Sequence, residues 1–107
     1  MNAANVVERV PIQTDAHGVV RVAGTRVTLE TIVDAFSAGA TAEEIAQQYP
    51  TVPLVDVYSV VAYYLRRQPE VEAYMKERAA LAMRVRREVD ERFPSAGIRE
   101  RLLARRP

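Results

Sequence analysis

The feature that most constrains the fold is a series of helix start and stop signals between residues 24 and 64. Thr28 is a suitable N-cap residue, and the apolar residues of the segment 29–36 recur at the i, i+3, i+4, i+7 spacing of an amphipathic helix. Gly39 stands where a left-handed C-cap residue is needed. Thr41 and Glu44 have the spacing of a capping box, which starts a second helix. These signals predict two short helices joined by a tight turn.

A third helix is expected soon after the second. The second helix should run from Ala42 to Tyr49 and end before Pro50, with Ile45 and Tyr49 facing inward. The linker 50–52 has helix-turn-helix length, and Pro53 suits a first helical turn. The sequence therefore predicts a tri-helical, homeodomain-like unit. The predicted buried face of its third helix consists of Leu54, Val57, Val61, Tyr64 and Leu65.

The flanking segments complete the predicted fold. Apolar residues alternate from Val10 to Val22 around the turn-forming segment 15–18, which predicts a short hairpin with an edge strand at Pro11. After Pro69, one long helix should extend from Glu70 to about Arg92 and be followed by a tail. We expect a mainly α fold with a short N-terminal β-hairpin, a helix-turn-helix unit and a long C-terminal helix. The predicted domains are 1–67 and 68–107.

Composition sets the outer limits of function. The chain has 107 residues, 49% of them apolar and 27% charged, which suits one small globular domain. Such a domain often recruits a second copy to bury its apolar surface, so we expect a homodimer. No apolar run reaches the length of a membrane span, no secretory signal is recognisable, and cysteine is absent. These features favour a cytoplasmic protein.

Charge is distributed unevenly along the chain. Residues 1–75 carry five basic and nine acidic residues, whereas residues 76–107 carry ten basic and five acidic residues. The net charge is therefore −4 in the first part and +5 in the second, although the whole chain carries only +1. A basic C-terminal part indicates a polyanion or an acidic pocket as its partner.

The third helix is the candidate DNA-reading element. Its first residues, Pro53 to Asp56, are apolar and acidic, whereas base readout favours arginine, lysine, asparagine or glutamine. The helix is therefore either a DNA reader or a part of the core and the dimer interface. The residues able to reach a duplex are Thr51, Tyr58, Ser59, Arg66 and Arg67.

No residue pattern indicates an enzyme. Glu43 and Glu44 are adjacent on a predicted helix, so their side chains point about 100° apart and do not share one substrate atom. His17 is expected in a turn, and without a second histidine or a cysteine it forms neither a metal site nor a catalytic pair. We expect no catalytic residue, no metal and no cofactor.

One known family shares several motifs with this chain in the same order. They are Gly24-Thr25-Arg26, Gly39-Ala40-Thr41 with Glu43-Glu44-Ile45, Tyr49-Pro50, and then Asp56 with Ala62-Tyr63. On these motifs, residues 18–66 resemble the small prokaryotic family DUF433, a domain of unknown function regarded as antitoxin-like. Members usually carry a Gly-Lys-Pro-like segment where this chain has Gly18-Val19-Val20-Arg21. The resemblance implies a helical, homeodomain-like or winged fold, dimers, and pairing with a PIN-like nuclease toxin.

The basic tail is the candidate partner-binding element. Apolar and arginine residues alternate in it so that a helix would have one apolar face, which requires a partner to cover it. An arginine fork is also well shaped to occupy the carboxylate cluster of a metal-dependent nuclease. Nucleic acid and a free, solvated tail are the alternatives. The candidate residues are Ile98, Arg99, Leu102, Leu103, Arg105 and Arg106.

Three functions are compatible with the sequence. The first is an antitoxin of a type II toxin–antitoxin pair that neutralises a nuclease-type toxin, with repression of its own operon as a further role. The second is a stand-alone helix-turn-helix transcription regulator, for which operator DNA would be the partner. The third is a structural dimerisation module without DNA contact.

Overall fold

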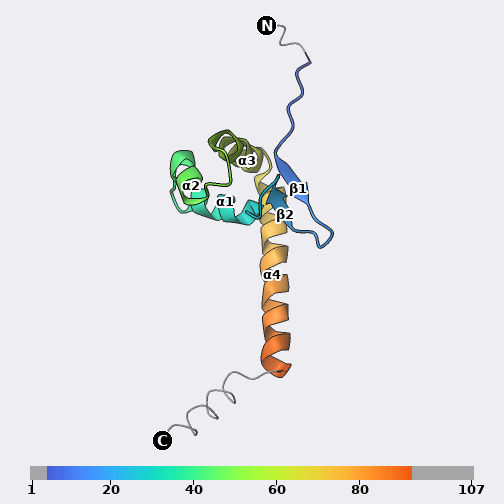
Figure 1. The fold of residues 1–107 in the computed structure, drawn as a ribbon. Helices are drawn as coiled ribbons and strands as arrows, with labels where there is room; N and C mark the ends of the chain where they lie inside the picture. The colour runs from blue at the N-terminus through green and yellow to red at the C-terminus, as the bar shows by residue number, and fades with distance from the viewer. Residues whose placement is uncertain (1–4, 93–107) are drawn as a thin grey trace, which may run out of the picture. The chain divides into compact units, whose positions relative to one another are not determined.

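The computed structural model describes residues 5–92 of the chain and confirms the predicted, mainly helical fold with an N-terminal hairpin (Figure 1). The chain divides into two compact units, Met1–Gln68 and Pro69–Pro107. The elements within the described residues are β1 (Ile12–Thr14), β2 (Val20–Val22), α1 (Leu29–Ser37), α2 (Ala42–Gln48), α3 (Leu54–Arg66) and α4 (Gln68–Arg92).

The hairpin is held together by its turn as much as by its strands. β1 and β2 are antiparallel, with Ile12 opposite Val22. The Asp15 carboxylate accepts hydrogen bonds from the backbone N–H groups of His17 (2.8 Å) and Val19 (3.1 Å), and Gly18 adopts a φ of +80°. An aspartate that binds the backbone in this way fixes a turn. The backbone N–H groups of Val19 and His17 lower the pKa of Asp15.

The Gly24-Thr25-Arg26 segment is the turn that joins β2 to α1. Gly24 has a φ of +76°, which a side chain would disfavour. The Thr25 hydroxyl donates to the carbonyl of Val22 (3.0 Å) and accepts from the N–H of Val27 (3.1 Å). The Val22 N–H in turn donates to the Val27 carbonyl (2.8 Å). The threonine therefore ties the hairpin to the start of α1.

The predicted caps determine where the short helices begin and end. The Thr28 hydroxyl accepts from the N–H of Thr31 (3.3 Å) at the start of α1, and Gly39 follows the helix with a φ of +102°. The capping box is present, since Thr41 accepts from the Glu44 N–H (3.1 Å) and the Glu44 carboxylate accepts from the Thr41 N–H (2.9 Å). These bonds satisfy backbone donors that a helix N-terminus leaves free.

The core of the Met1–Gln68 unit lies where α1, α2 and α3 meet beside the hairpin (Figure 1). Phe36 and Tyr64 pack edge to face, with ring centroids 6.5 Å apart at 76°. Phe36 and Tyr49, both predicted to face inward, are only partly buried. The fully or nearly fully buried side chains of this core are Val22, Leu29, Ile32, Val33, Ile45, Val52, Val57, Val60 and Tyr64.

Candidate functional site

The structure places the five predicted DNA-reading residues on α3 and just before it. Thr51 lies exposed in the linker between α2 and α3, and the other four are carried by α3 or follow it directly. Arg66 is the last residue of α3, and Arg67 is its C-cap. Only the two arginines carry a positive charge, and both lie at the end of the helix. Whether any of these residues contacts DNA stays a prediction.

Several of these side chains already have intramolecular partners. The Tyr58 hydroxyl donates to the Glu43 carboxylate of α2, and the Ser59 hydroxyl donates to the Val55 carbonyl (3.0 Å). The hydrogen bond between Tyr58 and Glu43 lowers the pKa of Glu43 and raises the pKa of Tyr58. The Arg67 guanidinium lies 5.3 Å from the ring centroid of Tyr63, within cation–π distance. These contacts stabilise the folded protein. They also leave fewer polar side-chain groups available for hydrogen bonds to the base edges of DNA.

The solvent-facing side of α3 is apolar, which the sequence did not predict. We call this side the outer face of α3 and define it by Leu54, Val55, Tyr58, Ala62 and Leu65. Four of these residues are well exposed to solvent, with exposed fractions of 41% for Leu54, 65% for Val55, 51% for Tyr58 and 52% for Leu65.

The predicted buried face of α3 was therefore wrong at Leu54 and Leu65. Val57 and Tyr64 are buried as predicted, Val61 is partly buried, and the additional core residue is Val60. The physical reason is that α3 has apolar residues around most of its circumference, so apolar periodicity alone does not fix which stripe faces the core. The number of apolar residues on α3, which is larger than one buried stripe requires, is the sequence signal for a second, exposed apolar stripe.

A shallow groove runs along the outer face of α3. Its volume is about 260 Å³. One wall is the N-terminal segment Glu8–Val10, and α3 supplies the other wall, including Ala62 and Arg66. The N-terminal segment adds exposed apolar surface of its own, because Val6 and Val7 are 69% and 92% exposed. The groove is smaller than the roughly 300–1,000 Å³ of typical small-molecule sites.

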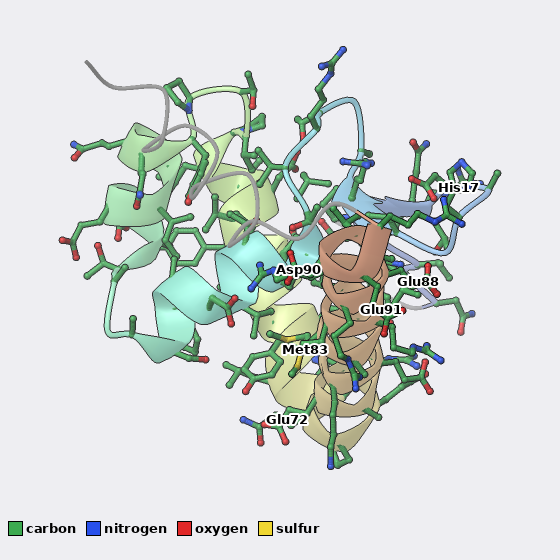
Figure 2. All side chains as sticks on the ribbon, turned by 90° about the horizontal axis from the view of Figure 1, so that it is seen from below. His17, Glu72, Met83, Glu88, Asp90 and Glu91 are labelled. Atoms are coloured by element: carbon green, nitrogen blue, oxygen red, sulfur yellow. The ribbon has the colours of Figure 1, made fainter. Side chains whose placement is uncertain are left out.

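Helix α4 presents a different kind of surface. Every residue from 79 to 92 is exposed, and in Figure 2 the side chains of Glu88, Asp90 and Glu91 radiate from the helix. The helix is formed without packing along this stretch because it is rich in strong helix formers such as alanine, leucine, methionine and arginine. Three of its exposed apolar residues, Leu81, Val85 and Val89, follow at helical spacing.

The charges of α4 occur in blocks. The segment 70–77 has three acidic residues and one lysine, the segment 78–87 has four arginines and no acid, and the segment 88–92 has three acidic residues and one arginine. The predicted partner-binding residues Ile98, Arg99, Leu102, Leu103, Arg105 and Arg106 lie outside the described residues.

Neither a metal site nor a membrane-spanning helix is found in the part of the chain that the structure describes. Within residues 5–92, no three histidine, aspartate or glutamate side chains are grouped so that they could hold a metal ion. His17 lies in the hairpin turn, where Figure 2 labels it. None of the helices in the same range is long and apolar enough to cross a bilayer.

Comparison with known proteins confirms the family resemblance for the helical unit. Residues 14–64 match the family described as protein of unknown function (DUF433). The match begins at the last residue of β1 and ends within α3, so it covers the hairpin turn, β2, the turn at Gly24, α1, α2 and most of α3. No curated protein and no solved structure matches the chain.

Proposed function

We propose that this chain, whose residues 14–64 form a DUF433 domain, is the antitoxin of a type II toxin–antitoxin pair in the cytoplasm. In this proposal it acts as a homodimer and neutralises a nuclease-type, PIN-like toxin. The C-terminal part, from residue 68 onward, makes the contact with the toxin. The tri-helical unit supplies the folded body from which this part extends in sequence.

The observation that carries the proposal is the exposure of α4. A helix of a small protein normally buries one face, because packing supplies most of its stability. Residues 79–92 bury none, and yet they include Leu81, Val85 and Val89 at helical spacing. A helix of this kind is suited to binding a partner. The residues that follow it in the chain, 93–107, are rich in arginine and include the three apolar residues predicted to contact the toxin.

Charge supports an acidic partner for this part of the chain. Residues 76–107 carry a net charge of +5, and the metal site of a nuclease is a cluster of carboxylates. Arg105 or Arg106 would meet that cluster, since a guanidinium binds a carboxylate through two parallel hydrogen bonds. Ile98, Leu102 and Leu103 would fill an adjoining apolar groove.

A stand-alone DNA-binding regulator is less well supported. The outer face of α3 is mostly leucine, valine and tyrosine, and the carboxylate of Glu43 lies against it. Both properties disfavour binding to phosphates and base edges. Repression of the operon would therefore depend on Arg66 and Arg67, and we expect it to be weak without the toxin.

The proposal is tested by co-expressing the chain with the protein encoded by the neighbouring gene. The full chain should co-purify with that protein and suppress its nuclease activity, whereas a chain that ends at Phe93 should do neither. Two full-length variants separate the contribution of the apolar tail residues from that of the two arginines. The triple variant I98S/L102S/L103S should lose binding, and R105A/R106A should retain part of the binding but lose most of the inhibition.

A matched control is Val89→Ser, which removes an apolar side chain from the described part of α4. It measures the share of α4 in the contact: binding close to that of the natural chain would confine the contact to residues 94–107, and a loss of binding would extend it into α4. Full inhibition by the chain ending at Phe93 would contradict the assignment of the tail. A protein from the neighbouring gene that neither binds the full chain nor has nuclease activity would contradict the antitoxin proposal itself.

A further inference from the structure

We infer that the outer face of α3 is the homodimer surface, on which α3 of one copy packs antiparallel to α3 of a second copy about a two-fold axis at Ala62. This inference rests on the proposed homodimer and assigns the surface through which it forms. It also gives the second helix of the helix-turn-helix pair a role other than reading DNA.

The outer face needs a partner because it is apolar and continuous. Leu54, Tyr58 and Leu65 follow one another along one side of α3 at helical spacing, with Val55 and Ala62 beside them. Isolated exposed apolar residues are common on proteins, but a contiguous stripe of them marks an interaction surface. Tyrosine and leucine in such a stripe are suited to the centre of a protein interface, where charged residues are scarce.

The arrangement of charge favours a second copy as the occupant. Tyr58 lies about one helical turn before Ala62, and Arg66 lies about one turn after it. Glu43 is hydrogen-bonded to Tyr58, so the face has an acidic end and a basic end. In an antiparallel pair about Ala62, Arg66 of each copy meets the Tyr58–Glu43 pair of the other. Such a face is self-complementary, as a two-fold interface requires.

Other arrangements fit less well. In a parallel pair, Arg66 would lie beside Arg66 of the other copy, and like charges would repel each other. A duplex on this face would meet the carboxylate of Glu43, which α2 holds against Tyr58 and which carries the same sign as the phosphates. A small ligand would have to bind in an open groove of only about 260 Å³.

Ala62 and the groove determine how closely the two helices approach. Because alanine is small, two helices that cross at Ala62 can approach toward the lower end of the usual 8–10 Å interaxial range. The groove between α3 and the segment Glu8–Val10 then receives side chains of the opposing helix. Arg9 and Glu8 border the groove and form part of its polar rim.

The first experiment measures the mass of the full-length protein by light scattering or sedimentation across a concentration series. The natural chain should be a dimer. The variants V55K and L65K, each at an exposed position, should keep the helical circular dichroism of the natural chain and weaken dimerisation at least about tenfold, because each places a charged lysine on the apolar face that the dimer buries. The matched control is V85K, because Val85 (51%) on α4 is as exposed as Leu65 (52%). It should leave the dimer unchanged.

The second experiment tests the antiparallel arrangement by exchanging charges. Both R66E and E43K should weaken dimerisation, because each places like charges opposite each other. The double variant R66E/E43K restores the attraction between the copies and should recover most of the lost affinity. Weakened single variants without recovery in the double variant would overturn the antiparallel arrangement.

The possible outcomes distinguish a wrongly assigned dimer surface from the absence of a homodimer. A monomeric natural chain would overturn both the homodimer and this surface. A dimeric natural chain whose V55K and L65K variants dimerise equally well would overturn the surface and leave the homodimer in place. If V85K alone dissociates the dimer, α4 is the interface and the inference about α3 is wrong.

Discussion

Replacement of Ile45 by alanine tests how α2 is attached to the core. α2 has seven residues, and Ile45 is its single buried residue, with 0% of its side chain exposed. A helix this short does not persist in water without packing. Removing the larger part of a fully buried isoleucine side chain costs about 2–5 kcal/mol, because apolar burial is lost and a cavity remains. Ile45→Val should cost about 0.5–1.5 kcal/mol.

These costs are large for a unit of this size. At about 0.05–0.15 kcal/mol per residue, the unit Met1–Gln68 has roughly 3–10 kcal/mol of total stability. Urea unfolding followed by circular dichroism should show midpoints that decrease from the natural chain to Ile45→Val to Ile45→Ala. With a slope of about 1–3 kcal/mol per M, a loss of 3 kcal/mol lowers the midpoint by roughly 1–3 M.

The control for this series is Gln47→Ala, which alters an exposed residue of the same helix. It should change the free energy of unfolding by less than about 0.5 kcal/mol. If Ile45→Ala also stays within that range, the packing of α2 on the core does not depend on Ile45, and the reasoning is refuted.

Three further predictions concern the caps, turns and acid stability. Thr28→Ala removes the N-cap of α1 and should cost about 1 kcal/mol in urea unfolding, whereas Thr28→Ser should cost much less. Gly39→Ala should cost about 1–2 kcal/mol by the same measurement; since an added Cβ meets no atom within 4 Å, the cost arises from the φ of +102° alone. The pKa of Asp15 is lowered by its backbone hydrogen bonds, so the stability that it contributes is present above its unfolded-state pKa and is lost as pH falls through the folded-state value. The melting temperature should therefore decrease as the pH is lowered below about 4, and this decrease should be less steep in Asp15→Asn. An equal dependence of the melting temperature on pH in the two proteins would contradict this reasoning.

The fold was predictable because its boundaries are set by local chemistry. Thr28 and Thr41 bind backbone N–H groups only three residues ahead, and Gly39 supplies a conformation that few other residues adopt. Such signals depend on neighbours in the sequence and not on tertiary contacts. The same holds for the hairpin turn, where the carboxylate of Asp15 binds the next few residues. Two helix boundaries differ slightly from the prediction: Tyr49 caps α2 and is not part of it, and α4 begins at Gln68 and not at Glu70.

The candidate site was harder to predict because it depends on contacts between distant residues. The bond between Tyr58 and Glu43 joins residues 15 positions apart, and no local pattern indicates it. The ion pair between Asp15 and Arg21 (3.4 Å) was not predicted either, although it joins residues only six positions apart across the hairpin. On α3, apolar residues occur on more than one side, and only the packing of α1 and α2 selects Val57, Val60 and Tyr64 as the buried set.

The last prediction is that the dimer surface and the toxin-binding surface act independently. The outer face of α3 belongs to the unit Met1–Gln68, and the predicted toxin contact belongs to Pro69–Pro107. Effects of substitutions at sites that share no contacts usually add. L65K should therefore weaken dimerisation and leave toxin binding per chain unchanged. I98S/L102S/L103S should do the opposite.

The decisive measurement is made on a chain that combines L65K with I98S/L102S/L103S. Its loss of dimerisation should equal that of L65K alone, and its loss of toxin binding should equal that of the tail variant alone, within about 0.5 kcal/mol. A larger loss of toxin binding in L65K would mean that the toxin contacts both copies at once. In that case the affinity for the toxin would arise from simultaneous binding to the two linked copies. The tail of one copy would then contribute a smaller part of that affinity.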